Sequence, residues 1–126
     1  MSIEELKEKF FTLNRVIRLV FDEIKYDEQN HLCVDYDLTN KEECMLYNTF
    51  SDLMHHLDYT NLYLDYLEKP ILKEGKITKS KTGEYKLKGI ILQQGQCIEI
   101  LKDDEWRMSI VGNLCKLRGE YARIRG

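Results

Sequence analysis

Residues 75–126 read GKITKSKTGEYKLKGIILQQGQCIEILKDDEWRMSIVGNLCKLRGEYARIRG, and the prediction of the fold starts from them. Short β-prone runs alternate there with turn residues, such as Lys81-Thr82-Gly83 and Lys88-Gly89. We expect strands at residues 76–80, 84–87, 90–92, 97–101, 106–111, 114–117 and 121–125. These runs amount to five or six strands in about fifty residues, too few for a large sandwich, and they predict a small five-stranded SH3-like or OB-like β-barrel, because closure removes exposed sheet edges.

Two amphipathic helices are expected before this module. The first covers residues 3–25 with Ser2 as its N-cap, and the second has Thr39 or Asn40 as its N-cap and ends before Pro70. Apolar residues recur at alternating spacings of three and four in both helices. The first stripe is Ile3, Leu6, Phe10, Leu13, Ile17, Val20 and Ile24, and the second is Leu46, Phe50, Leu53, Leu57, Leu64 and Leu67, with Thr60 in the same register.

The expected fold class is therefore α+β, with an antiparallel helical hairpin over residues 1–72 and the small barrel over residues 73–126. Between the helices, residues 32–38 alternate between apolar and polar, which favours a short strand or an extended segment. The alternative is that the hairpin stripes pair between two copies, so the chain is expected to be a monomer or a homodimer.

Charge differs between the two halves. Residues 1–72 hold 7 Lys and Arg against 15 Asp and Glu, whereas residues 73–126 hold 12 against 7, and these balances of −8 and +5 give the net charge of −3. No stretch is long and apolar enough for a membrane span, and the acidic amphipathic start is unlike a signal peptide, so a cytoplasmic protein is expected. The four cysteines have no metal-binding spacing, which favours reduced thiols.

A family resemblance rests on GKITKSKTGEYKL, on Gly95 before CIEIL, on Asp104-Glu105-Trp106, and on Leu117-Arg118-Gly119 with Ala122-Arg123-Ile124. Over roughly residues 75–126 these features resemble an uncharacterised family of small β-rich domains encoded by Gram-positive bacteria, phages and conjugative elements. The resemblance implies a mobile-element context and a binding role, and it implies no particular substrate.

A tyrosine stripe on the second helix is the candidate protein-binding surface. Its rings are spaced to share one helix face, and acids lie beside them. Tyrosine offers a large contact area at small entropy cost, whereas the alternative is that these rings pack inside the protein. The candidate residues are Asp58, Tyr59, Leu62, Tyr63, Asp65 and Tyr66.

Basic residues of the barrel are the candidate nucleic-acid contacts. Arg123 and Arg125 are two apart on a strand and project to one face, where they could neutralise phosphates. Pairing with acids of the hairpin is the alternative. The candidate set is Lys79, Lys81, Lys86, Lys88, Arg107, Arg123 and Arg125.

Enzymatic and metal-binding motifs are not evident. The chain has no Gly-rich phosphate loop, no GxSxG motif and no Cys–His couple, and the acids at residues 103–105 are typical of a solvated hairpin tip. Adjacent His55 and His56 point in different directions on a helix, and Asp52 with His56 supplies only two ligands. We therefore predict no catalytic residues, no metal and no cofactor.

The predicted function is non-enzymatic binding to a host protein in the service of a phage or mobile element. Its most concrete form is inhibition of a defence nuclease or effector complex, as anti-CRISPR proteins do, with the carboxylates of the hairpin imitating a phosphate backbone. The alternative is a nucleic-acid-binding module that uses the basic barrel. No membrane association is expected.

Overall fold

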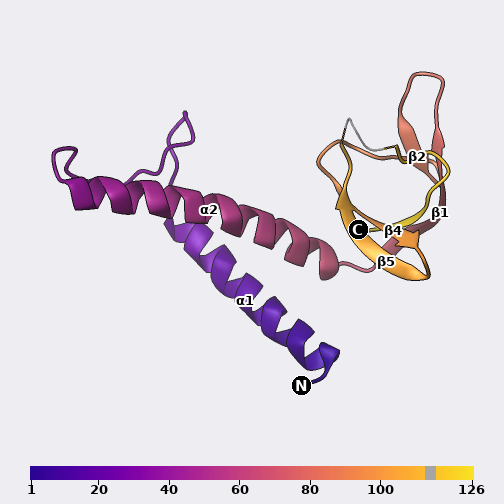
Figure 1. The fold of residues 1–126 in the computed structure, drawn as a ribbon, viewed down its shortest axis with the longest axis horizontal. Coiled ribbons are helices and arrows are strands. Elements are labelled where there is room, and N and C mark those ends of the chain that lie inside the picture. Colours follow the sequence, from indigo (N-terminus) through magenta and orange to yellow (C-terminus); the bar gives the residue numbers. More distant parts are fainter. Residues whose placement is uncertain (113–115) are drawn as a thin grey trace. The chain divides into compact units, whose positions relative to one another are not determined.

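The computed structural model describes residues 1–112 and 116–126 and consists of two compact units. The helical unit is residues 1–65, and the sheet unit is residues 66–126 (Figure 1). Two helices precede an antiparallel sheet, so the expected α+β class is confirmed. Neither helix is long and apolar enough to cross a membrane.

Both helices begin at polar caps that the sequence predicts. Helix α1 spans Ile3–Glu23, and the Ser2 side chain accepts a hydrogen bond from the Glu5 backbone N–H at 3.1 Å. Helix α2 spans Lys41–Leu67, and the Asn40 side chain accepts hydrogen bonds from the backbone N–H groups of Glu42 and Glu43, at 3.0 and 3.1 Å. These bonds satisfy donors that have no partner within the first turn of a helix. Helix α2 ends just before Pro70, as expected.

The connector between the helices is a folded loop, and the strand expected at residues 32–38 does not form. Within the part of the chain that the structure describes, its one ladder contact is an isolated bridge between Tyr26 and Leu32. The Asp27 carboxylate accepts backbone N–H bonds from Gln29 at 2.8 Å and from His31 at 2.9 Å, which closes a tight turn. Because this turn directs Leu32 back onto the helices, its side chain is buried although it has no neighbouring strand.

The two helices form an open antiparallel hairpin. The Asn14 amide donates to the Asp65 carboxylate at 2.8 Å, and Arg18 forms an ion pair with the same carboxylate. Asn14 and Ile17 are the buried residues of α1. The N-terminal half of α1 diverges from α2 (Figure 1), and the part of its stripe that lies there, including Leu6 and Phe10, is exposed. The hairpin therefore covers only part of the stripe on each helix.

Six strands form the sheet unit, in the order β3-β2-β1-β6-β4-β5, and every pairing is antiparallel. Their bounds are Ile71–Lys79 for β1, Tyr85–Leu87 for β2, Ile90–Ile91 for β3, Cys97–Lys102 for β4, Glu105–Ile110 for β5 and Tyr121–Arg125 for β6. The strand expected at residues 114–117 falls mainly outside the described residues, and Lys116 and Leu117 are not in a strand.

The sheet curls around its core but is not closed (Figure 1). Among the described residues, the end strands β3 and β5 do not pair with each other, so the five-stranded barrel is not confirmed. Strand β1 pairs with β6 through Ile71 to Lys76 and with β2 through Ile77 to Lys79, so one long strand serves two ladders. Strand β3 has only two residues, which leaves little backbone for a closing ladder.

The core of the sheet unit lies on the inner face of these strands. Ile77, Leu87, Ile98 and Ile124 are each at most 2% exposed.

The Lys88-Gly89 turn has φ angles of 49° and 86°, and the Asp103-Asp104 turn has φ angles of 52° and 62°. Two-residue turns with both φ angles positive match the right-handed twist of a β-hairpin, so these turns set the registers of β2–β3 and β4–β5.

Candidate functional site

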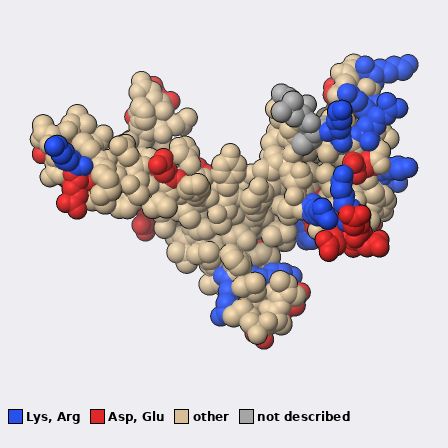
Figure 2. Space-filling view, in the orientation of Figure 1, with Lys and Arg blue, Asp and Glu red and all other residues tan. Residues whose placement is uncertain are grey.

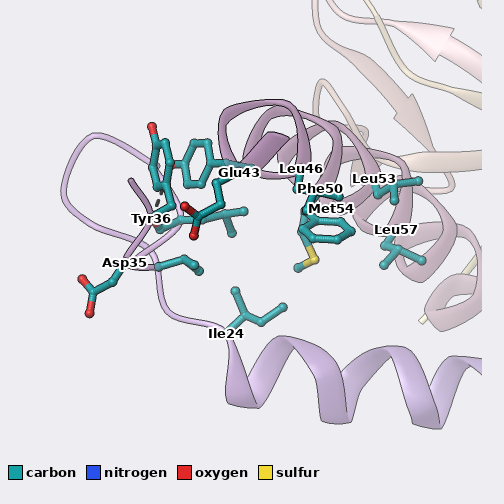
Figure 3. A pocket seen from close by; sticks show the side chains of 12 residues that line it. Ile24, Asp35, Tyr36, Glu43, Leu46, Phe50, Leu53, Met54 and Leu57 are labelled. Atoms are coloured by element: carbon teal, nitrogen blue, oxygen red, sulfur yellow. Dashed lines mark hydrogen bonds between the residues drawn. The ribbon is translucent and has the colours of Figure 1, made fainter. Parts of the chain in front are cut away.

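The candidate functional site is an apolar groove in the helical unit (Figure 3). Its volume is about 400 Å³. Side chains reach it from the N-terminal half of α2, from the connector and from the end of α1. The lining residues are Ile24, Leu32, Val34, Asp35, Tyr36, Glu43, Leu46, Tyr47, Phe50, Leu53, Met54 and Leu57.

The groove is shaped by the connector folding back on α2. The Tyr36 and Tyr47 rings stack with centroids 4.4 Å apart, and the Tyr47 hydroxyl donates to the Leu32 carbonyl at 3.3 Å. These contacts anchor the connector to the helix at one end of the groove. At the start of α2, the Asp37 carboxylate accepts hydrogen bonds from the Thr39 hydroxyl and backbone N–H, which lower the pKa of Asp37.

The groove has a buried floor and an exposed apolar rim. Met54 and Leu32 are 5% and 8% exposed, whereas Phe50 and Leu53 are 52% and 49% exposed. In Figure 3, the Phe50 and Met54 side chains extend from α2 toward Ile24. Isolated exposed apolar residues are common, but a contiguous group around a hollow marks an interaction surface.

The electrostatic character of the groove is acidic. Asp35 and Glu43 are the charged residues among the described side chains that line it. The Asp35 carboxylate points outward at the edge of the groove (Figure 3). An apolar groove with two acidic residues in its lining favours a ligand that is apolar along one line and basic beside that line.

The tyrosine stripe is divided between two environments. Asp58, Tyr59, Leu62 and Tyr63 are exposed on α2, and the first three, with His55, line a shallow depression of about 380 Å³. The Asp65 carboxylate accepts hydrogen bonds from Asn14 and Arg18 within the helical unit. Tyr66 is buried at 6% exposure in the sheet unit. The candidate residues therefore do not form one continuous surface.

Two of the candidate phosphate-binding arginines contact a buried carboxylate. Glu99 on β4 is 4% exposed and accepts hydrogen bonds from Arg123 at 2.9 Å and from Arg125 at 3.0 Å. The Tyr66 hydroxyl donates to the same carboxylate at 3.0 Å. Burial alone would raise the pKa of Glu99, but the bonds from Arg125, Arg123 and Tyr66 outweigh it and hold that pKa below its usual range. Burial and the nearby Glu99 charge raise the pKa of Tyr66.

Aromatic residues complete this cluster. The Arg123 guanidinium lies over the Trp106 ring, 4.2 Å from its centroid, and the Trp106 and Tyr121 rings are 6.1 Å apart. Arg123 and Arg125 do project to one face, but that face already holds their counter-ion. These side chains therefore form a hydrogen-bonded network within the sheet unit, in which both arginines contact Glu99.

The other basic candidates lie at the surface of the sheet unit. Lys79, Lys81, Lys88 and Arg107 are exposed, and Lys86 is half-buried. Arg107 forms ion pairs with Asp103 at 3.7 Å and Glu105 at 3.9 Å. Figure 2 shows Lys and Arg side chains gathered over this unit.

Metal-ligand geometry is not found within residues 1–112 and 116–126, where no group of three His, Cys, Asp or Glu side chains is placed to hold an ion. Cys33, Cys44 and Cys97 are present as thiols, and burial raises the pKa of Cys97.

Part of the groove lining was predicted as the paired stripes of the hairpin, and none of it as a site. The lining residues that belong to those stripes are Ile24, Leu46, Phe50, Leu53 and Leu57. Their heptad spacing is the same whether a partner helix covers them or not, so periodicity alone could not distinguish these cases. One signal was present in the sequence. Glu43 falls in the same heptad register as Leu46 and Phe50, and a carboxylate at a seam position indicates that this end of the seam is open to solvent.

No family model, no curated protein and no solved structure matches the chain. The resemblance of residues 75–126 to small domains of mobile elements therefore stays a prediction.

Proposed function

We propose that the chain is a non-enzymatic binding protein that docks on a protein partner through the groove of α2. The occupant is an amphipathic helix of the partner with apolar residues along one face and basic residues beside them. The observation that carries this proposal is the exposed apolar rim, Phe50 and Leu53, above a hollow whose lining charges are both negative. Helix-in-groove recognition uses this combination of an apolar seam and complementary charge.

The energetics favour such an occupant. Burying the exposed half of a large apolar side chain contributes roughly 1 kcal/mol, and the groove offers several such residues. Because the floor is formed by buried Met54 and Leu32, the hollow exists before the partner binds, which lowers the cost of ordering it.

A model peptide tests the proposal. The probe is a fluorescent synthetic helix with leucine at its seam positions and lysine elsewhere, and its controls are a scrambled peptide and a version with glutamate in place of lysine. We expect saturable binding to the Leu/Lys helix and weak binding to both controls. Binding should be lost in the Phe50→Ser/Leu53→Ser variant and retained in Ile91→Ser, which alters an equally exposed side chain on β3. Equal binding of all three peptides, or an unaffected double variant, would refute the groove.

The proposed biological form of this docking is inhibition of a nuclease or effector complex that carries a cationic surface. The acidic surplus of residues 1–72 supports this form. Its test is target cleavage by purified CRISPR effector nucleases with and without a molar excess of the protein. We expect at least one enzyme to lose activity, and the loss should disappear in the Phe50→Ser/Leu53→Ser variant. Undiminished cleavage by every enzyme would count against inhibition while leaving peptide binding as a separate result.

Nucleic-acid binding by the sheet unit is the second candidate. Exposed Lys79, Lys81 and Lys88 lie on or near the β1–β2 and β2–β3 turns and support it. A gel shift with generic DNA and RNA should then show binding that weakens steeply with salt and is reduced in Lys79→Gln/Lys81→Gln. If the chain produces no shift at low salt, this candidate is excluded.

A further inference from the structure

The N-terminal half of α1 has the surface of a helix that binds in a groove. Ile3, Leu6, Phe10 and Leu13 are 75%, 39%, 45% and 44% exposed, and their spacing places them at the a and d positions of consecutive heptads. Lys7 and Lys9 then occupy the two positions that flank this seam. Glu4, Glu5 and Glu8 fall on the opposite, outward face. An apolar seam bordered by lysines therefore stands uncovered on the helix.

Direct pairing of this seam with its own copy has no charge complementarity. In an antiparallel pair each lysine would face its own equivalent, and like charges across a helix seam disfavour the pairing. In a parallel pair a g position faces the e position five residues further along the partner, so Lys9 would face the uncharged Asn14. Lys7 forms a 3.3 Å ion pair with Glu4 of the same helix, but both side chains are exposed and such a pair contributes little. The seam therefore favours an acidic apolar counterpart.

The groove on α2 meets that requirement. Its lining charges, Asp35 and Glu43, are both negative. The helical side of the groove runs from Glu43 to Leu57, which is about 21 Å along the axis, and the seam from Ile3 to Leu13 is about 15 Å long. The seam is therefore short enough to lie within the groove, with its lysines close to Asp35 and Glu43.

We infer that the groove on α2 accepts the N-terminal half of α1 from a second copy of the chain. This inference rests on the proposed function, because the second copy and the partner helix would compete for the same groove. In a closed pair each copy supplies one seam and one groove, so the same contact forms twice. A partner helix would have to displace α1 of the second copy, and binding would then depend on the protein's own concentration.

Sedimentation velocity of the full chain over a wide concentration range is the test. We expect a monomer–dimer equilibrium. The seam variant Leu6→Asp/Phe10→Asp and the groove variant Phe50→Asp/Leu53→Asp should each weaken dimerisation by about tenfold or more. Mixing the two variants should restore part of the dimer, because each retains the surface that the other lacks. Ile91→Ser is the matched control, and far-UV circular dichroism verifies that each variant is folded.

Charge reversal supplies a second arm that does not depend on the apolar variants. Lys7→Glu/Lys9→Glu and Asp35→Lys/Glu43→Lys should each weaken the dimer, and a mixture of the two should recover it. A chain that is monomeric at every concentration overturns the inference, and so does a dimer that survives both apolar variants. If the monomer still binds the Leu/Lys peptide, the proposed function stands without the inference. If it binds neither peptide nor second copy, both fail.

Discussion

The two units differ in how they bury their apolar residues. In the sheet unit, Ile77, Leu87, Ile98 and Ile124 are almost completely enclosed by their own strands. In the helical unit, apolar residues of both helices are between 39% and 52% exposed, namely Leu6 and Phe10 of the seam and Phe50 and Leu53 of the groove rim. A sheet that curls over its inner face covers that face with its own strands, whereas two diverging helices leave apolar side chains exposed. This exposed apolar surface is what the proposed docking would use.

Alanine substitution should distinguish the buried apolar residues of the sheet unit from the exposed apolar residues of the helical unit. Ile98→Ala removes a fully buried side chain and should lower the free energy of unfolding by about 3 kcal/mol. Leu53→Ala, at the groove rim, should change it by less than about 0.5 kcal/mol. Urea unfolding is followed by the fluorescence of Trp106, the single tryptophan, for the sheet unit and by far-UV circular dichroism for the helical unit that contains Leu53. Similar decreases in the free energy of unfolding for Ile98→Ala and Leu53→Ala would contradict this difference between the two units.

The next effect concerns the buried carboxylate of the sheet unit. Glu99→Gln leaves Arg123 and Arg125 without their counter-ion and should cost about 2 kcal/mol at neutral pH. The pKa of Glu99 is lowered by folding, so its stabilisation is complete above the unfolded pKa and is lost as pH falls through the folded pKa. The variant should therefore lose less stability in acid than the parent. Glu84→Gln, at an exposed site, is the control for this comparison.

A smaller effect distinguishes two tyrosines of the stripe. Tyr66→Phe removes the hydroxyl that donates to Glu99 at 3.0 Å, and we expect it to cost about 1 kcal/mol. Tyr59 is 60% exposed, so Tyr59→Phe should leave stability unchanged. Denaturant midpoints of the two variants provide the measurement. Equal midpoints for Tyr66→Phe and the parent would mean that the buried hydroxyl contributes nothing.

The smallest expected effect has opposite signs in the two units. Asp104 has a φ of 62°, a conformation that glycine adopts without steric cost, so Asp104→Gly should raise stability by about 0.5 kcal/mol. Asp58 lies within α2, where glycine lowers helix propensity, so Asp58→Gly should cost about 0.5 kcal/mol. Thermal unfolding by circular dichroism gives both signs. A destabilised Asp104→Gly variant would show that the aspartate itself holds the turn.

Much of the local structure could be predicted from the sequence. The caps at Ser2 and Asn40, the Lys88-Gly89 turn and most strands follow from residues close together in the chain. The strand expected within the connector was wrong, because the Asp27 turn overrides the alternation of residues 32–38. The first half of β1 was missed, since residues 71–75 look like a charged linker until β6 pairs with them.

The candidate site was less predictable for a physical reason. Heptad spacing indicates that Phe50 and Leu53 share a face, but it contains no information on the angle at which α1 crosses α2. Likewise, the alternation in β6 predicts that Arg123 and Arg125 share a face, and only the pairing of β6 with β4 brings Glu99 between them.

Two amphipathic helices, a β-rich second half and an uneven distribution of charge follow from the order of the amino acids alone. These properties depend on neighbours within a few residues of one another, so local propensity and periodicity are sufficient. Which part of each helical stripe is covered, and which arginines are accessible at the surface, depend on how the elements pack. Those outcomes depend on contacts between residues 47 to 51 positions apart in the hairpin and 24 to 26 apart in the sheet, and such contacts form only when the whole chain has folded.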